Sequence, residues 1–77
     1  MKWQERISVD PRICHGTACI AGTRVMVSVV LDNLAAGETA AAIAAAYRIA
    51  PEDVQAALLY AAELAKERVV PLSAGVE

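Results

Sequence analysis

A chain of 77 residues has room for one domain, and its formal charge of -2 lacks the basic balance typical of a nucleic-acid-binding domain. Hydrophobic residues make up 57% of the sequence, but aromatic residues account for only 4% and phenylalanine is absent. Because much of the apolar fraction is alanine, which contributes little buried area, we expect a thin core and a homodimer or higher homo-oligomer. We recognise no signal peptide and no apolar run long enough to span a bilayer, which predicts a cytoplasmic protein without membrane contact.

Residues 6–26 are predicted to form a strand and loop segment ahead of the helices. Apolar and polar side chains alternate over residues 6–10, the period of a strand, and Pro11 ends that strand because proline cannot donate a ladder hydrogen bond. The β-branched stretch at residues 23–26 predicts a second short extended segment. We therefore expect one or two short N-terminal β-strands.

An irregular loop is expected between these segments, over residues 12–22, with turn points at Gly16 and Gly22 where the backbone needs positive φ. Three soft metal ligands lie in this loop: Cys14, His15 and Cys19. A structural zinc site needs four ligands, usually in two separated pairs, and the sequence has no second pair. The loop is therefore predicted to hold two packed, reduced thiols and no metal, with a strained disulfide as the alternative.

The first helix is predicted over residues 27–36, because apolar side chains recur there at helical spacing. Gly37 follows directly, as expected for the left-handed residue that closes a helix. Thr39 is a good N-cap for a second helix, Ala40–Tyr47. The predicted inward face of this second helix contains Ile43, Ala46 and Tyr47.

The third helix is predicted to run from Pro51 to about Glu67, so that the three helices occupy residues 27–67. Its predicted inward stripe contains small and aliphatic residues: Val54, Ala57, Leu58, Ala61, Leu64 and Ala65. Its predicted exposed face contains mostly polar residues: Glu52, Asp53, Gln55, Ala56, Tyr60, Glu63, Lys66 and Glu67. Residues 68–77 contain a proline and a glycine and are expected to form a flexible tail.

The second and third helices are separated by only about three residues, with small side chains where they would cross, and this spacing matches a helix-turn-helix. The expected fold is therefore mainly α, a three-helix helix-turn-helix core preceded by one or two short strands, in a single domain over residues 1–77. A plain three-helix bundle has the same hydrophobic spacing and remains the alternative.

DNA binding by the third helix is not favoured, because Glu52 and Asp53 at its start repel phosphate. Any binding is expected to be weak, strongly salt-dependent and carried mainly by arginines. The candidate DNA-binding residues are Arg12, Arg24, Arg48 and Gln55.

Catalysis is not expected either, and no cofactor is predicted. The one histidine, His15, adjoins Cys14 directly, and adjacent side chains rarely aim at one reacting atom. The alternative is a structural loop in which histidine and arginine act as hydrogen-bonding braces. Its residues are His15, Gly16, Gly22, Thr23 and Arg24.

The sequence between Arg6 and Lys66 resembles a widespread prokaryotic domain-of-unknown-function family of short proteins. The most specific parts of the resemblance are the His15-Gly16 pair and the Gly22-Thr23-Arg24 triplet at their mutual spacing. The other residues that carry it are Ile7, Asp10, Pro11, Ile13, Cys14, Ile20, Ala21, Val25, Leu34, Ala35, Gly37, Ile43, Tyr47, Pro51, Glu52, Asp53, Val54, Ala56, Ala57 and Tyr60. Members are commonly classed as VapB-type antitoxin-like, beside genes for PIN-like nucleases.

The resemblance implies a homeodomain-like or winged-helix-like core and the role of antitoxin in a type II toxin–antitoxin pair. Such a protein would neutralise a PIN-like nuclease, with operator DNA as a further partner through which it would regulate its own operon. The sequence departs from the family at Ala41 and Ala42, where members carry acidic residues, and at Ala50, where members often have Ser or Thr as N-cap. The lost cap should cost about 1 kcal/mol.

The end of the third helix and the tail are the predicted surface for the nuclease. A charged stretch there precedes apolar anchors. PIN-like nucleases resemble one another in having an acidic metal site, and a basic side chain would suit that site. The predicted partner-binding residues are Lys66, Arg68, Val69, Val70 and Leu72. A stand-alone helix-turn-helix DNA-binding regulator and a structural dimerisation module are the alternative functions.

Overall fold

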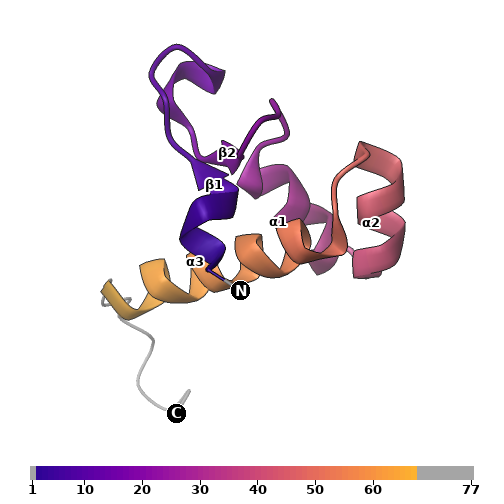
Figure 1. Ribbon diagram of the computed structural model, residues 1–77. Coiled ribbons are helices and arrows are strands. Elements are labelled where there is room, and N and C mark those ends of the chain that lie inside the picture. The colour runs from indigo at the N-terminus through magenta and orange to yellow at the C-terminus, as the bar shows by residue number, and fades with distance from the viewer. Residues whose placement is uncertain (1, 68–77) are drawn as a thin grey trace.

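The structure, a computed structural model, describes residues 2–67 and contains three α-helices and a short antiparallel sheet near the N-terminus (Figure 1). The elements in chain order are the 3-10 helix η1 (Trp3–Arg6), β1 (Ile7–Ser8), the 3-10 helix η2 (Cys14–Gly16), β2 (Cys19–Ile20), α1 (Val27–Ala35), α2 (Ala40–Tyr47) and α3 (Pro51–Glu67). A mainly α protein with short N-terminal strands was predicted, and this is confirmed. The predicted tail, residues 68–77, lies outside the described residues.

The sheet contains two strands of two residues each, with Ile7 opposite Ile20 and Ser8 opposite Cys19. The predicted strand over residues 6–10 is therefore too long, because residues 3–6 coil into η1. The second strand lies inside the predicted loop, and Met26 forms only an isolated bridge with Cys19. Sequence reasoning missed β2 because both of its side chains are buried, so they show no alternation of apolar and polar residues.

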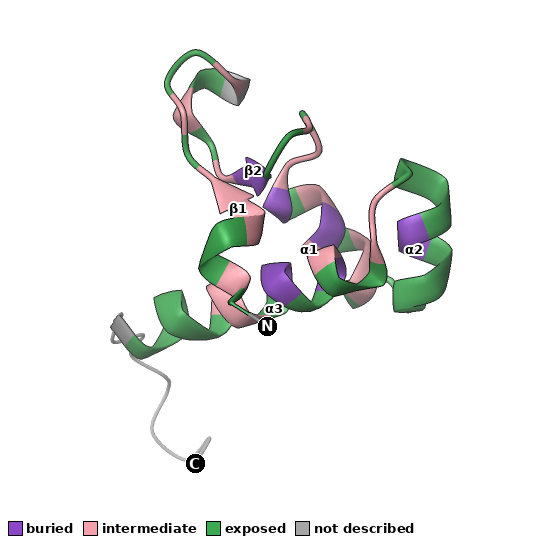
Figure 2. Cartoon of the chain, in the orientation of Figure 1, coloured by how far each residue is buried: buried purple, intermediate pink, exposed green. Residues whose placement is uncertain are grey.

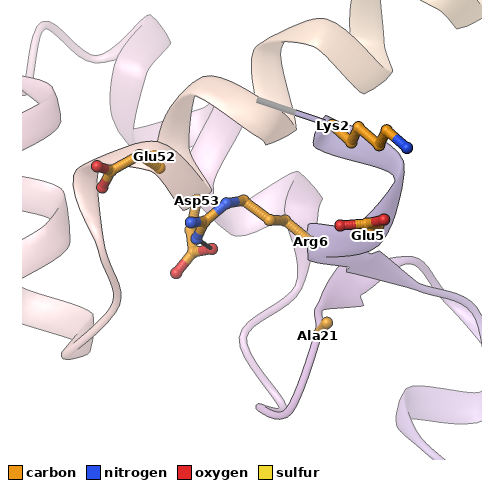
Figure 3. Close-up of a pocket in the computed structure, with 6 residues that line it drawn as sticks. All are labelled: Lys2, Glu5, Arg6, Ala21, Glu52 and Asp53. Carbon is orange, nitrogen blue, oxygen red and sulfur yellow. Dashed lines mark hydrogen bonds and ion pairs between the residues drawn. The ribbon is translucent and has the colours of Figure 1, made fainter.

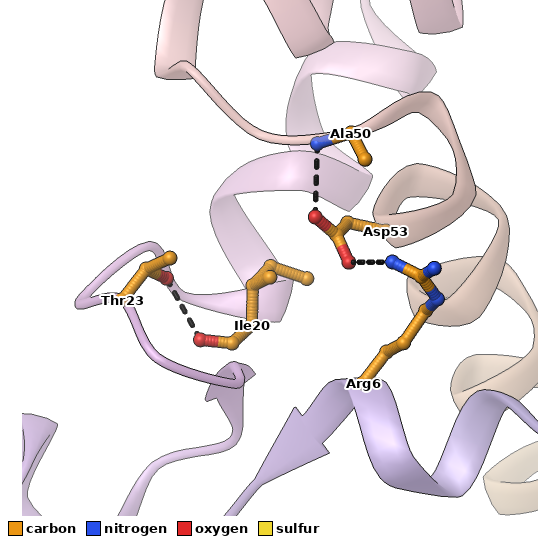
Figure 4. A network of polar contacts seen from close by, with 5 residues as sticks. All are labelled: Arg6, Ile20, Thr23, Ala50 and Asp53. Atoms are coloured by element: carbon orange, nitrogen blue, oxygen red, sulfur yellow. Dashed lines mark hydrogen bonds and ion pairs between the residues drawn. The ribbon is translucent and has the colours of Figure 1, made fainter.

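A tight turn connects β2 to the extended residues before α1 (Figure 4). The Thr23 amide and the Thr23 hydroxyl both donate to the Ile20 carbonyl oxygen, at 3.0 and 2.8 Å, and the Thr23 hydroxyl accepts from the Val25 amide at 3.0 Å. Gly22 has φ of +78°, as the third residue of such a turn requires, and Gly16 has φ of +82°. The predicted positive φ at both glycines is confirmed.

The end of α1 and the start of α2 follow the capping rules, whereas the end of α2 does not. After α1, Gly37 has φ of +97°, its amide donates to the Leu34 carbonyl, and the Glu38 amide donates to the Asn33 carbonyl, which is a Schellman motif. The Thr39 hydroxyl accepts from the Ala42 amide at 3.1 Å and so caps α2 as predicted. The exception is the end of α2, where a non-glycine residue, Arg48, takes the left-handed conformation with φ of +57°.

The core lies where α1, α2 and α3 meet beneath β2 (Figure 2). Its buried residues are Cys19, Ile20, Val27, Val30, Ile43, Ala44, Val54, Ala56 and Ala57. On α2 the predicted inward face is wrong at Ala46 and Tyr47, which are exposed, while Ala44 is buried instead.

The predicted inward stripe of α3 is also partly wrong. Leu58 and Leu64 are 43% and 41% exposed, and Ala65 is exposed as well. Ala56, which was expected on the exposed face, is completely buried, and Asp53 and Tyr60 are partly buried. The reason is η1, which packs along α3 and brings Trp3 against Tyr60, with ring centroids 6.1 Å apart. The buried face of α3 is therefore turned toward the N-terminal segment.

Candidate functional site

The start of α3 is held to the N-terminal segment by one carboxylate, that of Asp53 (Figure 4). Arg6 Nη1 donates to Asp53 Oδ1 at 2.9 Å, and the Ala50 amide donates to Asp53 Oδ2 at 2.9 Å. Ala50 occupies the N-cap position and Asp53 the third helical position, so this second bond is one half of a capping box. Asp53 therefore supplies one half of the box, while Ala50 has no side-chain acceptor to supply the other.

An open depression of about 700 Å³ surrounds this ion pair (Figure 3). It is lined by charged side chains of both signs and one alanine: Lys2, Glu5, Arg6, Ala21, Glu52 and Asp53. In Figure 3 the Arg6 side chain extends toward Asp53, while Glu52 points away from the pair. Since charges of both signs alternate around the depression and its central pair is already satisfied, it does not select for anions or for cations.

A second hollow is apolar and lies between α1, α3 and the residues before β2. Its volume is about 240 Å³, and we refer to it as the α1–α3 groove. The residues that line it are Thr17, Ala18, Val27, Ser28, Leu31, Tyr60 and Leu64. Sequence reasoning missed this groove because it placed Leu64 in the core and Tyr60 on the exposed face. Leu64, one of the exposed leucines of α3, belongs to the lining of this groove.

The loop before β2 is closed by a local ion pair. The Asp10 carboxylate accepts from the Arg12 amide at 2.9 Å and from the Arg12 guanidinium at 3.1 and 3.2 Å. The Arg12 side chain, and after it the Arg12 amide, lower the pKa of Asp10 below its ordinary value of 3.8. Arg12 is thus already paired in the loop, although its side chain is 89% exposed.

His15 takes a left-handed backbone conformation with φ of +55°, followed by Gly16. Among the described residues, the His15 side chain forms no hydrogen bond. What His15 contributes to the loop is its left-handed backbone conformation. Within the predicted structural loop, the Thr23 side chain braces the chain in the turn described above. Among the side chains that the structure describes, no three or more His, Cys, Asp or Glu residues lie close enough together to hold a metal ion.

The predicted DNA-binding residues come from four separate segments. Arg12 lies in the loop before β2, Arg24 in the turn after β2, Arg48 at the end of α2 and Gln55 on α3, and all four are exposed. In Figure 1 the three segments with arginines follow one another along the upper side of the molecule, while α3 runs along the lower side. The arginines and Gln55 are therefore not arranged along one helix.

Of the predicted partner-binding residues, the structure describes only Lys66. This side chain is exposed and pairs with Glu63, with Nζ and Oε2 3.0 Å apart, on the surface of the last turns of α3. The others, Arg68, Val69, Val70 and Leu72, lie outside the described residues. Within residues 2–67, no helix combines the length and the apolar character needed to cross a membrane.

Comparisons with known proteins identify relatives of this chain. A family model described as "Protein of unknown function (DUF433)" matches residues 7–61. Among solved structures, the chain is similar to the X-ray crystal structure of Rv2018 from Mycobacterium tuberculosis, with a TM-score of 0.66 and 33% sequence identity. That match covers 74% of this chain but only 27% of Rv2018, so the chain corresponds to about a quarter of the larger protein. A search of the curated proteins found no match.

Proposed function

This chain belongs to the DUF433 family of proteins of unknown function, and from that premise we propose that it is a non-enzymatic, antitoxin-like protein that binds and neutralises a PIN-like nuclease. The proposal follows the resemblance described above and needs a surface for the partner on the second half of α3 and the residues after it. It requires no catalytic group and no cofactor in this chain.

The observation that carries the proposal is the exposure of apolar side chains on α3. Leu58 and Leu64 are each more than 40% exposed on one helix, Leu58 next to its midpoint and Leu64 in its second half. Exposed apolar side chains clustered on one element indicate an interaction surface more strongly than scattered ones. The predicted anchors Val69, Val70 and Leu72 follow this part of α3 directly in the sequence. Exposed aliphatic side chains, together with the basic residues Lys66 and Arg68 near them in the sequence, would suit a partner with an acidic active site.

The decisive experiment is co-expression with the PIN-like gene beside this one, followed by co-purification and a nuclease assay. We expect a stable complex in which nuclease activity is inhibited. The double substitution Leu58→Ser and Leu64→Ser should weaken inhibition about tenfold or more, equivalent to about 1.4 kcal/mol, because both side chains lose apolar contact with the partner. Ala62→Ser on the exposed surface of the same helix is the matched control. Full inhibition by the double variant would contradict this surface.

A second variant tests the basic rim. Arg68→Gln removes the charge proposed to reach the acidic site of the nuclease, and it should weaken inhibition. Arg12→Gln makes the same change of charge in the loop before β2 and should leave inhibition unchanged. If the two variants inhibit equally well, Arg68 does not enter the active site.

DNA binding is a second candidate, in which α2 and α3 act as a helix-turn-helix or α2 and the loops contact the operator. The observation in its favour is the Arg6–Asp53 ion pair, which neutralises one of the two carboxylates at the start of α3. We expect weak binding that falls steeply with salt and that Arg24→Gln and Arg48→Gln reduce at all sequences alike. Fluorescence anisotropy with operator DNA at two salt concentrations measures this. A large loss of sequence specificity in Gln55→Ala would instead indicate base reading by α3.

A further inference from the structure

The α1–α3 groove has the chemistry of a site for aliphatic side chains. Val27 forms its buried part, Leu31 and Tyr60 are half-buried beside it, and Leu64 is 41% exposed at its edge. The polar groups of its lining residues are the hydroxyl groups of Thr17, Ser28 and Tyr60, and none of these side chains is charged at neutral pH. Its volume of about 240 Å³ is below the range of about 300–1,000 Å³ in which small-molecule sites fall. The groove therefore fits one or two apolar side chains and lacks the charged groups that would hold a polar metabolite.

The chain carries a matching segment immediately after α3. Residues 69–72 are Val-Val-Pro-Leu, three aliphatic side chains and a proline. Pro71 disfavours helical geometry at the residue before it, so the sequence predicts that the chain leaves the helix by about this point. Leu64, at the edge of the groove, precedes the end of α3 at Glu67 by only three residues.

The distances allow this segment to reach the groove of its own chain. From Tyr60 to Glu67 there are seven helical steps, which span about 10 Å at 1.5 Å per residue. Four extended residues span about 13 Å, so residues 69–72 can run back beside α3 from its end to Tyr60. Because the segment is joined to the groove by so short a connection, its effective concentration there is in the millimolar range, above that of a second copy at ordinary protein concentrations.

We propose that the α1–α3 groove is the docking site of the chain's own Val69–Leu72 segment, with valine or leucine side chains against Leu31, Tyr60 and Leu64. Docking covers the exposed edge of the groove and shields the apolar residues of the segment from water. Under the proposed function the same residues contact the nuclease, so the groove and the nuclease compete for one segment. That competition rests on the proposed function, whereas the docking itself does not.

The test is nuclear magnetic resonance on the full-length, uniformly ¹³C-labelled chain without any partner. Nuclear Overhauser effects are expected between the methyl groups of Val70 or Leu72 and the ring protons of Tyr60. In a sample mixing labelled and unlabelled chains, isotope-filtered spectra should lack these cross-peaks, because the contact is within one chain. Absence of the cross-peaks from the pure sample, or their presence between chains in the mixed sample, would overturn the proposal.

Limited proteolysis supplies an independent measurement. Trypsin cleavage after Arg68 should accelerate about tenfold in the full-length variant Val70→Ser, Leu72→Ser, because the undocked segment is open to the protease. Val76→Ser makes a comparable change beyond the segment and should be cleaved like the wild type, and circular dichroism confirms that each variant is folded. Equal cleavage rates in all three proteins would overturn the docking. The proposed function is tested separately, by co-purification with the nuclease.

Discussion

Asp53 pairs with Arg6, which lies 47 residues earlier in the sequence. The pair therefore connects two distant parts of the chain. One carboxylate oxygen accepts from Arg6 and the other from the Ala50 amide. The sequence placed Asp53 on an exposed helical face, where it would only complement the helix dipole. The structure makes it the contact that joins η1 to the start of α3, with its side chain only 14% exposed.

We predict that Asp53→Ala lowers the free energy of unfolding by about 1–2 kcal/mol, since it removes a capping bond and leaves the half-exposed Arg6 without its partner. Urea denaturation measures the change. Glu52→Ala removes the neighbouring carboxylate, which is exposed, and should alter stability by less than about 0.5 kcal/mol. Equal effects of the two substitutions would show that Asp53 acts only through the helix dipole.

The end of α2 shows how one residue can bear a conformational cost for a turn between helices. Arg48 has φ of +57°, and the following Ile49 amide donates to the Ala44 carbonyl at 3.0 Å, which closes the helix as a glycine usually does. Ile49 is half-buried against the core, so the left-handed residue directs an apolar side chain inward. Left-handed geometry costs an ordinary residue roughly 1–2 kcal/mol relative to right-handed geometry.

Arg48→Gly is therefore predicted to raise the free energy of unfolding by about 0.5–1 kcal/mol, because glycine adopts positive φ without the steric cost. Arg48→Val should lower it, since a β-branched side chain tolerates this conformation poorly. Thermal and urea denaturation of both variants test the pair. A loss of stability in Arg48→Gly would mean that the arginine side chain makes a stabilising contact that outweighs the backbone gain.

The buried face of α3 is the element-scale feature that depends most on the N-terminal segment. Ala56 is completely buried, although helical periodicity within α3 placed it outside. Its burial accompanies the contact of η1 with α3, which also covers part of Tyr60 through Trp3. This second contact face consists of alanine, aspartate and tyrosine. The apolar stripe of the helix therefore does not indicate it.

Ala56→Leu should lower the free energy of unfolding by about 1–3 kcal/mol, because a larger side chain has no room where alanine is fully buried. Ala62→Leu, at an exposed position of the same helix, should change it by less than about 0.5 kcal/mol. Chemical denaturation of the two variants compares the faces directly. If Ala62→Leu is the more damaging substitution, the assignment of the buried face is wrong.

The whole molecule presents an edge strand that suits assembly with another copy. β1 pairs with β2 on one side and has no described strand on its other side, and Val9, directly after β1, is 60% exposed. A two-stranded sheet of this length is marginal by itself. The homodimer, with the N-terminal strand and the first helix at the interface, stays a prediction. The outer edge of β1 indicates where two copies would pair.

We expect light scattering at micromolar concentration to give the mass of a dimer, and Val9→Lys to shift the protein toward the monomer, because charge on an edge strand opposes pairing between sheets. Glu38→Lys introduces the same side chain in the exposed connection between α1 and α2 and should leave the assembly unchanged. A folded monomer of the wild type at this concentration would exclude the dimer.

Several features of this protein follow from local sequence alone. The bounds of α2 and α3, the cap at Thr39 and the left-handed conformations of Gly16, Gly22 and Gly37 are where the sequence predicts them. Each depends on interactions within a few residues: backbone hydrogen bonds, a side-chain cap, or the absence of a Cβ atom. Such short-range interactions can be predicted from the sequence without knowing how the elements pack together.

The features that place the candidate surfaces depend on contacts between distant segments. The strand Cys19–Ile20, the Arg6–Asp53 pair and the rotation of α3 that buries Ala56 and exposes Leu64 all require η1 and the N-terminal sheet to lie against the helices. A helix rich in alanine has little hydrophobic contrast around its circumference, so its own periodicity does not determine which side is buried. The tertiary structure decided that side, and with it which apolar residues remain at the surface.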